Sequence, residues 1–219
     1  MTTPLYIETA ESIYVNMGDL IADQLISCGN DLNVTMGSIE TRGKIDVEGD
    51  IDCGSDISAG DLICAGYIKA RGYVYAKNDI TAQSSISVVN NYIEANNILA
   101  LSGIKSGPIK CHNNLVADSI EANGYVVAAN DIITIKDISA TQSIVVGKRI
   151  YAGGTIKVGD DFNIISGYKI KTSEWKKLPC VRSASRPSNI LAGEWKRISL
   201  TQVKKMVDED LILEYRSAE

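Results

Sequence analysis

Aliphatic residues recur at a spacing of five to seven residues along most of the chain. Between residues 39 and 162 we mark 22 such positions, with a mean spacing of about 5.9 residues. A small inward residue follows two positions later, as in Ile68-Lys69-Ala70, because residues i and i+2 of a strand share a face. Gly, Asn or Ser then provides a bend. The repeat therefore predicts short strands joined by corners, with weaker copies back to Ile7 and forward to Tyr168.

A second period shows how many strands make one coil. Every third unit is alike and recurs after 17 or 18 residues, and these units begin at Asp61, Asp79, Asn97, Asn114, Asp131 and Arg149. Like residues stack when successive coils pair in register. We therefore predict an all-β fold, a single-stranded three-sided parallel β-helix of about nine coils of ~18 residues. The general crossover preference favours a right-handed coil. Two stacks are expected along it: Ile68, Ile86, Ile104, Ile120 and Ile138, and Tyr73, Tyr92, Pro108 and Tyr125.

The repeat units have the form G-x-[IV]-x-[AV], three to a coil. In this they resemble the bactofilin-type, polymer-forming β-helix over about residues 7–170. The resemblance implies a β-helical core and end-to-end assembly into filaments.

Residues 172–219 do not follow the repeat, so we divide the chain into a parallel β-helix at 1–171 and a C-terminal segment at 172–219. Ser199 and Gln202 predict a capping box that starts a helix over residues 199–208. Residues 211–215 are predicted to form a strand. The segment is a small α+β cap over the last coil, a docking element for a partner, or both.

One side of the predicted prism carries an outward apolar stripe. The residue after the inward aliphatic residue should face solvent, and on this side it reads Ile26, Asp46, Ile63, Thr81, Leu99, Val116, Ile133 and Tyr151. The apolar part runs from Leu99 to Tyr151 and is joined by Leu101 and Ile135. Contiguous outward apolar area marks a covered surface. Either the C-terminal segment or a second chain is expected to cover it.

Charge is unevenly distributed. The net charge is −5, yet residues 1–162 carry −9 and residues 163–219 carry +4. An acidic body argues against nucleic-acid binding. The densest acidic run comprises Asp46, Glu48, Asp50, Asp52, Asp56 and Asp61, on outward or corner positions. It is interpreted as a solvated face or as a docking patch for a basic partner.

The residues that could carry chemistry are few. His112 is the single histidine and lies in a corner. Cys53, Cys64 and Cys111 fall on the small inward position, whereas Cys28 and Cys180 lie outside the pattern. The Asp and Asn residues that begin every third unit are interpreted as corner side chains bonded to the backbone, with cation binding as the alternative. We predict no catalytic, cofactor-binding or metal-binding residues.

The sequence thus favours a non-enzymatic interaction protein. No apolar run reaches the ~18 residues of a membrane helix, and the N-terminus lacks a secretory signal. We expect a cytoplasmic protein with reduced thiols, without cofactor, that binds a protein partner, of which a bacterial immunity or inhibitor protein is one form. A discrete monomer or dimer is expected. The alternatives are a bactofilin-like, self-assembling cytoskeletal scaffold and an enzyme whose site forms between subunits.

Overall fold

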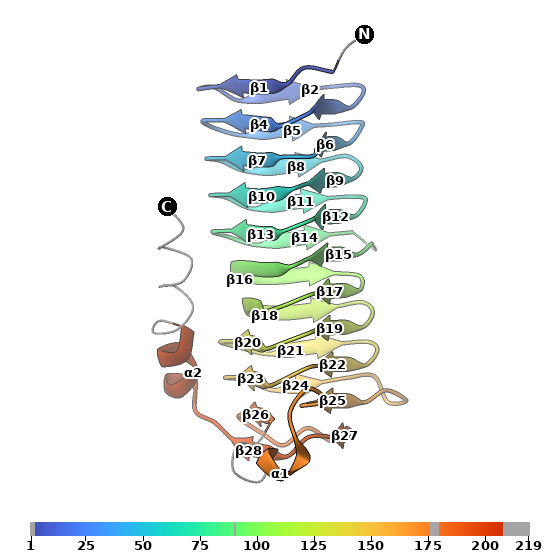
Figure 1. The fold of residues 1–219 in the computed structure, drawn as a ribbon, viewed down its shortest axis with the longest axis vertical. Helices are drawn as coiled ribbons and strands as arrows, with labels where there is room; N and C mark the ends of the chain where they lie inside the picture. The colour runs from blue at the N-terminus through green and yellow to red at the C-terminus, as the bar shows by residue number, and fades with distance from the viewer. Residues whose placement is uncertain (1–2, 90, 176–179, 208–219) are drawn as a thin grey trace.

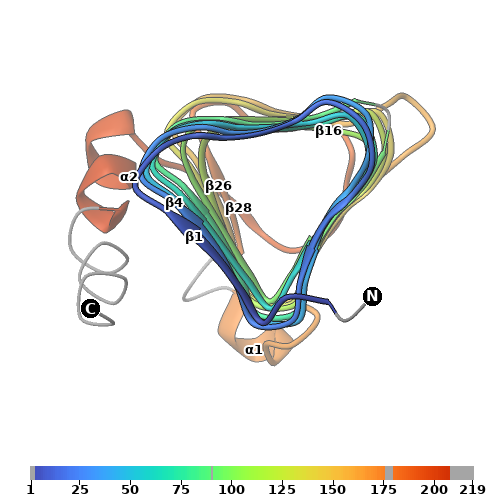
Figure 2. The ribbon, with the colours of Figure 1, turned by 90° about the horizontal axis from the view of Figure 1, so that it is seen from above.

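The computed structural model describes residues 3–89, 91–175 and 180–207. Its strands stack in three columns, and each column is held together by parallel pairing of a strand with its counterpart one coil further on (Figure 1). Viewed along the long axis the coils have a triangular outline (Figure 2). The prediction of a parallel β-helix is confirmed.

The strands of each column are short and nearly all of three or four residues. The first column contains β1 (Tyr6–Thr9), β4 (Leu25–Cys28), β7 (Lys44–Val47), β10 (Asp61–Cys64), β13 (Asp79–Ala82), β16 (Asn97–Ser106), β18 (Leu115–Ala122), β20 (Ile132–Thr134), β23 (Ile150–Ala152), β26 (Val181–Ser183) and β28 (Trp195–Arg197). The second contains β2 (Ile13–Val15), β5 (Leu32–Val34), β8 (Ile51–Cys53), β11 (Ile68–Ala70), β14 (Ile86–Val88), β21 (Ile138–Ala140) and β24 (Ile156–Lys157). The third contains β3 (Leu20–Ala22), β6 (Ile39–Thr41), β9 (Ile57–Ala59), β12 (Val74–Ala76), β15 (Ile93–Ala95), β17 (Ile109–Cys111), β19 (Val126–Ala128), β22 (Ile144–Val146), β25 (Ile164–Ser166) and β27 (Ile190–Ala192).

Two long strands join the first and second columns. β16 and β18 continue through the corner, so their first halves pair with each other in the first column and their second halves in the second. The pairing register shifts between Ala100 and Gly103 at that corner. The chain runs clockwise as it recedes from the N-terminal end, through β1, β2 and β3, which makes the coil right-handed (Figures 1 and 2).

The core is a stack of similar layers, in which equivalent positions of successive coils lie in register. The predicted isoleucine column exists in register: Ile68 pairs with Ile86, Ile86 with Ile104, Ile104 with Ile120, and Ile120 with Ile138. All five side chains are at most 2% exposed. Aliphatic residues supply the bulk of each layer and Ala, Val or Cys fills the space beside them, so each coil buries its apolar face on the next.

Side-chain oxygens stabilise one edge of the prism. Asp61 Oδ1 accepts a hydrogen bond from the backbone N–H of Asp79 one coil later, and Asp79 Oδ1 accepts from Asn97 in the same way. The series continues through Asn114 and Asp131 to the N–H of Arg149. These bonds have donor–acceptor distances between 2.8 and 3.3 Å. The interpretation as corner-to-backbone bonding is therefore confirmed.

The sequence pattern misplaced three residues. Ile26, predicted to face outward, is fully buried, because β4 pairs Ile26 rather than Leu25 with the inward Ile45. A one-residue slip moves a side chain to the other face. Phe162 and Tyr168, taken as the last inward residues, are exposed, since a turn at 160–161 delays the strand and Ile164 takes the inward position beside Ile144.

Strand stacking also continues beyond residue 171. β26 pairs with β23, β28 with β26, and β27 with β25, so part of the C-terminal segment adds irregular strands to the β-helix. Trp195 stands in register with Val181, packs against the end of the core and donates its indole N–H to Ser183 Oγ at 3.0 Å. The predicted cap thus includes a further partial coil, which Trp195 closes.

The C-terminal segment also forms two short helices, α1 (Thr172–Trp175) and α2 (Leu200–Met206). The predicted capping box of α2 is present: Ser199 Oγ accepts from the backbone N–H of Gln202, and the Gln202 side chain accepts from the backbone N–H of Ser199. The strand predicted at 211–215 lies outside the described residues.

Candidate functional site

Most of the apolar stripe of the first column is covered by the protein itself, while Leu101 stays 50% exposed. Leu99, Val116, Ile133 and Tyr151 form one buried cluster with three residues of the C-terminal segment, Ile198, Val203 and Val207. The guanidinium of Arg182 lies over the Tyr151 ring, 5.3 Å from its centroid. Of the two expected coverings, the structure shows the C-terminal segment. These four predicted partner-binding residues are at most 9% exposed, and α2 lies beside β20 and β23 (Figure 1).

The acidic run divides into two structural roles. Asp50 and Asp56 are corner residues, whose carboxylates accept hydrogen bonds from the backbone N–H groups of Tyr67 and Tyr73, each at 2.8 Å. These two side chains primarily stabilise the coil.

Asp61 has the same corner role, whereas Asp46, Glu48 and Asp52 face outward. Asp46 forms an ion pair with Lys44 at 2.6 Å, and Asp52 forms one with Lys69 at 2.9 Å. Glu48 is exposed. Partly exposed pairs of this kind contribute little free energy, so much of the predicted patch is compensated locally.

The charge of the rod is graded along its axis. The first 61 residues contain twelve acids and two bases, whereas residues 163–207 contain two acids and ten bases. The N-terminal coils are therefore strongly acidic and the C-terminal half is basic. Dividing the charge by coil rather than at residue 162 would have revealed this gradient from the sequence.

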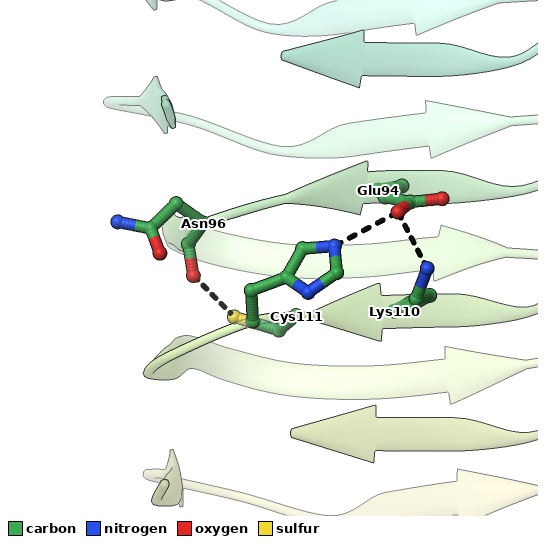
Figure 3. A network of polar contacts seen from close by, with 5 residues as sticks. Glu94, Asn96, Lys110 and Cys111 are labelled. Atoms are coloured by element: carbon green, nitrogen blue, oxygen red, sulfur yellow. Dashed lines mark hydrogen bonds and ion pairs between the residues drawn. The ribbon is translucent and has the colours of Figure 1, made fainter. Parts of the chain in front are cut away.

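The single histidine belongs to a surface ion network on the third column. Its Nε2 lies 2.8 Å from Glu94 Oε1, and the Lys110 ammonium donates to the same oxygen at 2.7 Å (Figure 3). The hydrogen bond from Lys110 lowers the pKa of Glu94 below its usual value. An open recess of about 330 Å³ adjoins the network and is lined by Asn91, Tyr92, Glu94, Pro108, Lys110 and Tyr125.

An aromatic stack rises beside this recess. The rings of Tyr73 and Tyr92 are parallel with centroids 5.2 Å apart, as expected for residues at matching corners of successive coils. The sequence pattern anticipated this stack but not the ion network, although the register of the strands places Glu94 beside Lys110 of the next coil.

All five cysteines are buried. Cys111 precedes His112 but points inward and donates to the carbonyl oxygens of Asn96 and Asn114 at 3.2 and 3.0 Å. Burial raises the pKa of Cys53 to about 11 and those of Cys64 and Cys111 to about 12. These thiols stay protonated at neutral pH, so they do not act as nucleophiles in this conformation. Cys28 proves to occupy the small inward position too, two residues after Ile26.

The described residues contain neither a metal-ligand cluster nor a membrane-spanning helix. Over residues 3–89, 91–175 and 180–207, no three His, Cys, Asp or Glu side chains gather where they could hold a metal ion. In the same part of the chain no helix is long and apolar enough to cross a membrane.

These features define a parallel β-solenoid. Side-chain hydrogen bonds at its corners join successive coils, and a folded-back helix covers part of one face. A comparison with known families identifies it further. The Flagellar Assembly Protein A beta solenoid domain family, FapA, matches residues 24–177, more than two thirds of the chain. The chain therefore belongs to this family. No curated protein and no solved structure matches it. The match supports the β-helical architecture that the bactofilin-type resemblance implied, but it does not confirm the resemblance itself.

Proposed function

We propose that this protein is a rigid, non-enzymatic binding scaffold that acts in flagellar assembly. The observation that carries the proposal is the match of residues 24–177 to the β-solenoid family named for flagellar assembly. Protein binding fits this role, with a flagellar component as partner in place of the target of a bacterial immunity or inhibitor protein.

The fold supports a role as a scaffold. A continuous core and in-register corner bonds make each coil depend on its neighbours. The rod is therefore rigid along its length and can hold bound partners at fixed distances. About ten coils at ~4.8 Å each give a length of roughly 45–50 Å. Such a rod offers long faces on which a partner can be held.

Binding rather than catalysis also fits the chemistry of the side chains. Glu94 already contacts both Lys110 and His112. The thiols of Cys53, Cys64 and Cys111 point inward and are protonated at neutral pH. Reduced thiols fit a cytoplasmic setting, which is part of the proposal.

Deletion of the gene in a flagellated host that carries it tests the role. We expect fewer flagella per cell in electron micrographs and smaller swimming zones in soft agar, both restored by the full chain supplied in trans. A deletion strain with a normal number of flagella and normal swimming would refute the proposed function.

A further inference from the structure

The first coil exposes a strand edge. β1 pairs with β4, β2 with β5, and β3 with β6, and within the described residues no other strand pairs with any of the three (Figure 1). The inward residues Ile7 of β1 and Ile13 and Val15 of β2 pack against the core yet are only partly buried, whereas Leu20 and Ala22 of β3 are buried. An unpaired edge with apolar side chains beside it is a template for a further strand.

Large apolar side chains gather on the same end. Tyr14 is 67% exposed and Met17 79% exposed, and Leu5, Tyr6, Ile21 and Met36 are also exposed. An exposed group of this size marks a contact surface.

The negative charge around this end favours a basic segment as the added strand. The first 41 residues contain six acids and no Lys or Arg. Glu8 faces outward on β1, Glu11 follows that strand, and both are exposed, with no ion pair among the described residues. A strand added beside β1 would place apolar residues next to Ile7 and basic residues next to Glu8, since cross-strand neighbours on one face interact.

A second copy of this chain fits the edge less well. Two N-terminal ends in contact would bring together two surfaces whose charged side chains are all acidic, and these surfaces would repel each other. The C-terminal end is basic, but it is irregular: β27 pairs with β25 through a register shift, and α1 lies beside one corner of the prism at the level of β28 (Figures 1 and 2). It therefore lacks a regular edge to match β1, β2 and β3.

We propose that the N-terminal coil is a docking site where a partner protein adds an extended segment of alternating apolar and basic residues as a strand on β1. Main-chain hydrogen bonds to the free edge would supply affinity. Glu8 and Glu11 would supply charge selectivity and faster association. The identification of the partner as a flagellar component rests on the proposed function, whereas the site itself does not.

The test uses the full chain and a fluorescein-labelled peptide of five Lys-Val repeats, followed by fluorescence anisotropy. We expect saturable binding that weakens at least tenfold in the Glu8→Lys/Glu11→Lys variant. The matched control is Glu121→Lys/Glu174→Lys, which changes charge equally at two exposed carboxylates away from the first coil. It should bind within about twofold of the wild type. The same peptide N-methylated at alternate residues cannot donate to a strand edge and should not bind.

Several results would overturn the proposal. Absence of binding to the wild type, equal losses in both charge variants, or equal binding of the N-methylated peptide would each exclude strand addition at β1. Sedimentation velocity gives a separate check. If the protein alone forms end-to-end oligomers that Glu8→Lys/Glu11→Lys abolishes, the edge serves a second copy instead.

The Glu8→Lys/Glu11→Lys chain, returned to the deletion strain, separates the two proposals. Peptide binding at β1 together with normal flagella in the deletion strain would refute the flagellar role and leave the docking site standing. Loss of flagella on deletion, fully restored by this variant, would refute the docking site and leave the flagellar role standing.

Discussion

Val203 is a buried contact between α2 and the β-helix. It is fully buried in the cluster with Leu99, Val116, Ile133 and Tyr151. A helix of seven residues is not stable by itself in water, so α2 persists because this apolar contact holds it. Replacing Val203 with Ala removes two methyl groups at about 0.8 kcal/mol each and leaves a small cavity. We expect the docking free energy of α2 to fall by about 2 kcal/mol.

The effect should be local. A loss of about 2 kcal/mol raises the undocked population roughly 30-fold, while the core layers of the β-helix keep all their contacts. Amide hydrogen exchange, read by mass spectrometry, should show the amides of residues 200–206 exchanging roughly 30-fold faster in Val203→Ala. Those of β10 to β15 should be unchanged.

The neighbouring residue provides a control. Lys204 is exposed on the same helix, so Lys204→Ala should change the docking free energy of α2 by no more than a few tenths of a kcal/mol, and amide exchange should change little. Unchanged exchange of α2 in Val203→Ala would show that the apolar cluster does not hold it. Equal acceleration in β10 to β15 would show that α2 and the β-helix unfold as one unit.

Three further substitutions or conditions test the β-helix itself. Ile104→Asp should abolish cooperative folding in thermal scans, because an unpaired buried charge costs several kcal/mol. Asp79→Ala should cost about 1–3 kcal/mol in urea unfolding, since its Oδ1 accepts from both the backbone and the side chain of Asn97, whereas Asp79→Asn keeps an oxygen and should cost less. Cys64 should resist Ellman's reagent at pH 8 until the protein is unfolded. Because burial raises the folded-state pKa of this thiol from 9.0 to about 12, the stability it contributes is complete below pH 9 and is lost as pH rises toward 12, visible as a falling thermal midpoint.

The architecture was predictable because each unit repeats one physical requirement. An inward aliphatic residue, a small residue two positions on and a bend suffice to define a coil, and the column from Ile68 to Ile138 was predicted correctly. The pattern failed where two adjacent residues could both face inward. In β4, Leu25 and Ile26 are equally apolar, and only pairing with Lys44 and Ile45 in the next coil decides between them.

The predictions for the site were limited by long-range contacts. The periodicity showed that Leu99, Val116, Ile133 and Tyr151 face outward, but not which segment covers them, because Val203 is about 50 residues beyond Tyr151. The corner role of Asp50 could have been inferred, since it occupies the same place in its coil as Asp31, which accepts from the Asp50 N–H in turn. We predicted Asp50 and Asp56 as docking residues because we treated the whole acidic run from Asp46 to Asp61 as one outward surface.

The two ends of the rod differ in a way that bears on assembly. Open stacking of a β-helix requires regular, unpaired strand edges at both ends and charges that attract. At the basic end Trp195 packs against the end of the core, and β27 joins its column through a shifted register. At the acidic end β1, β2 and β3 keep free edges in regular register. Because the two ends differ in this way, we expect a discrete binding protein rather than a bactofilin-like filament.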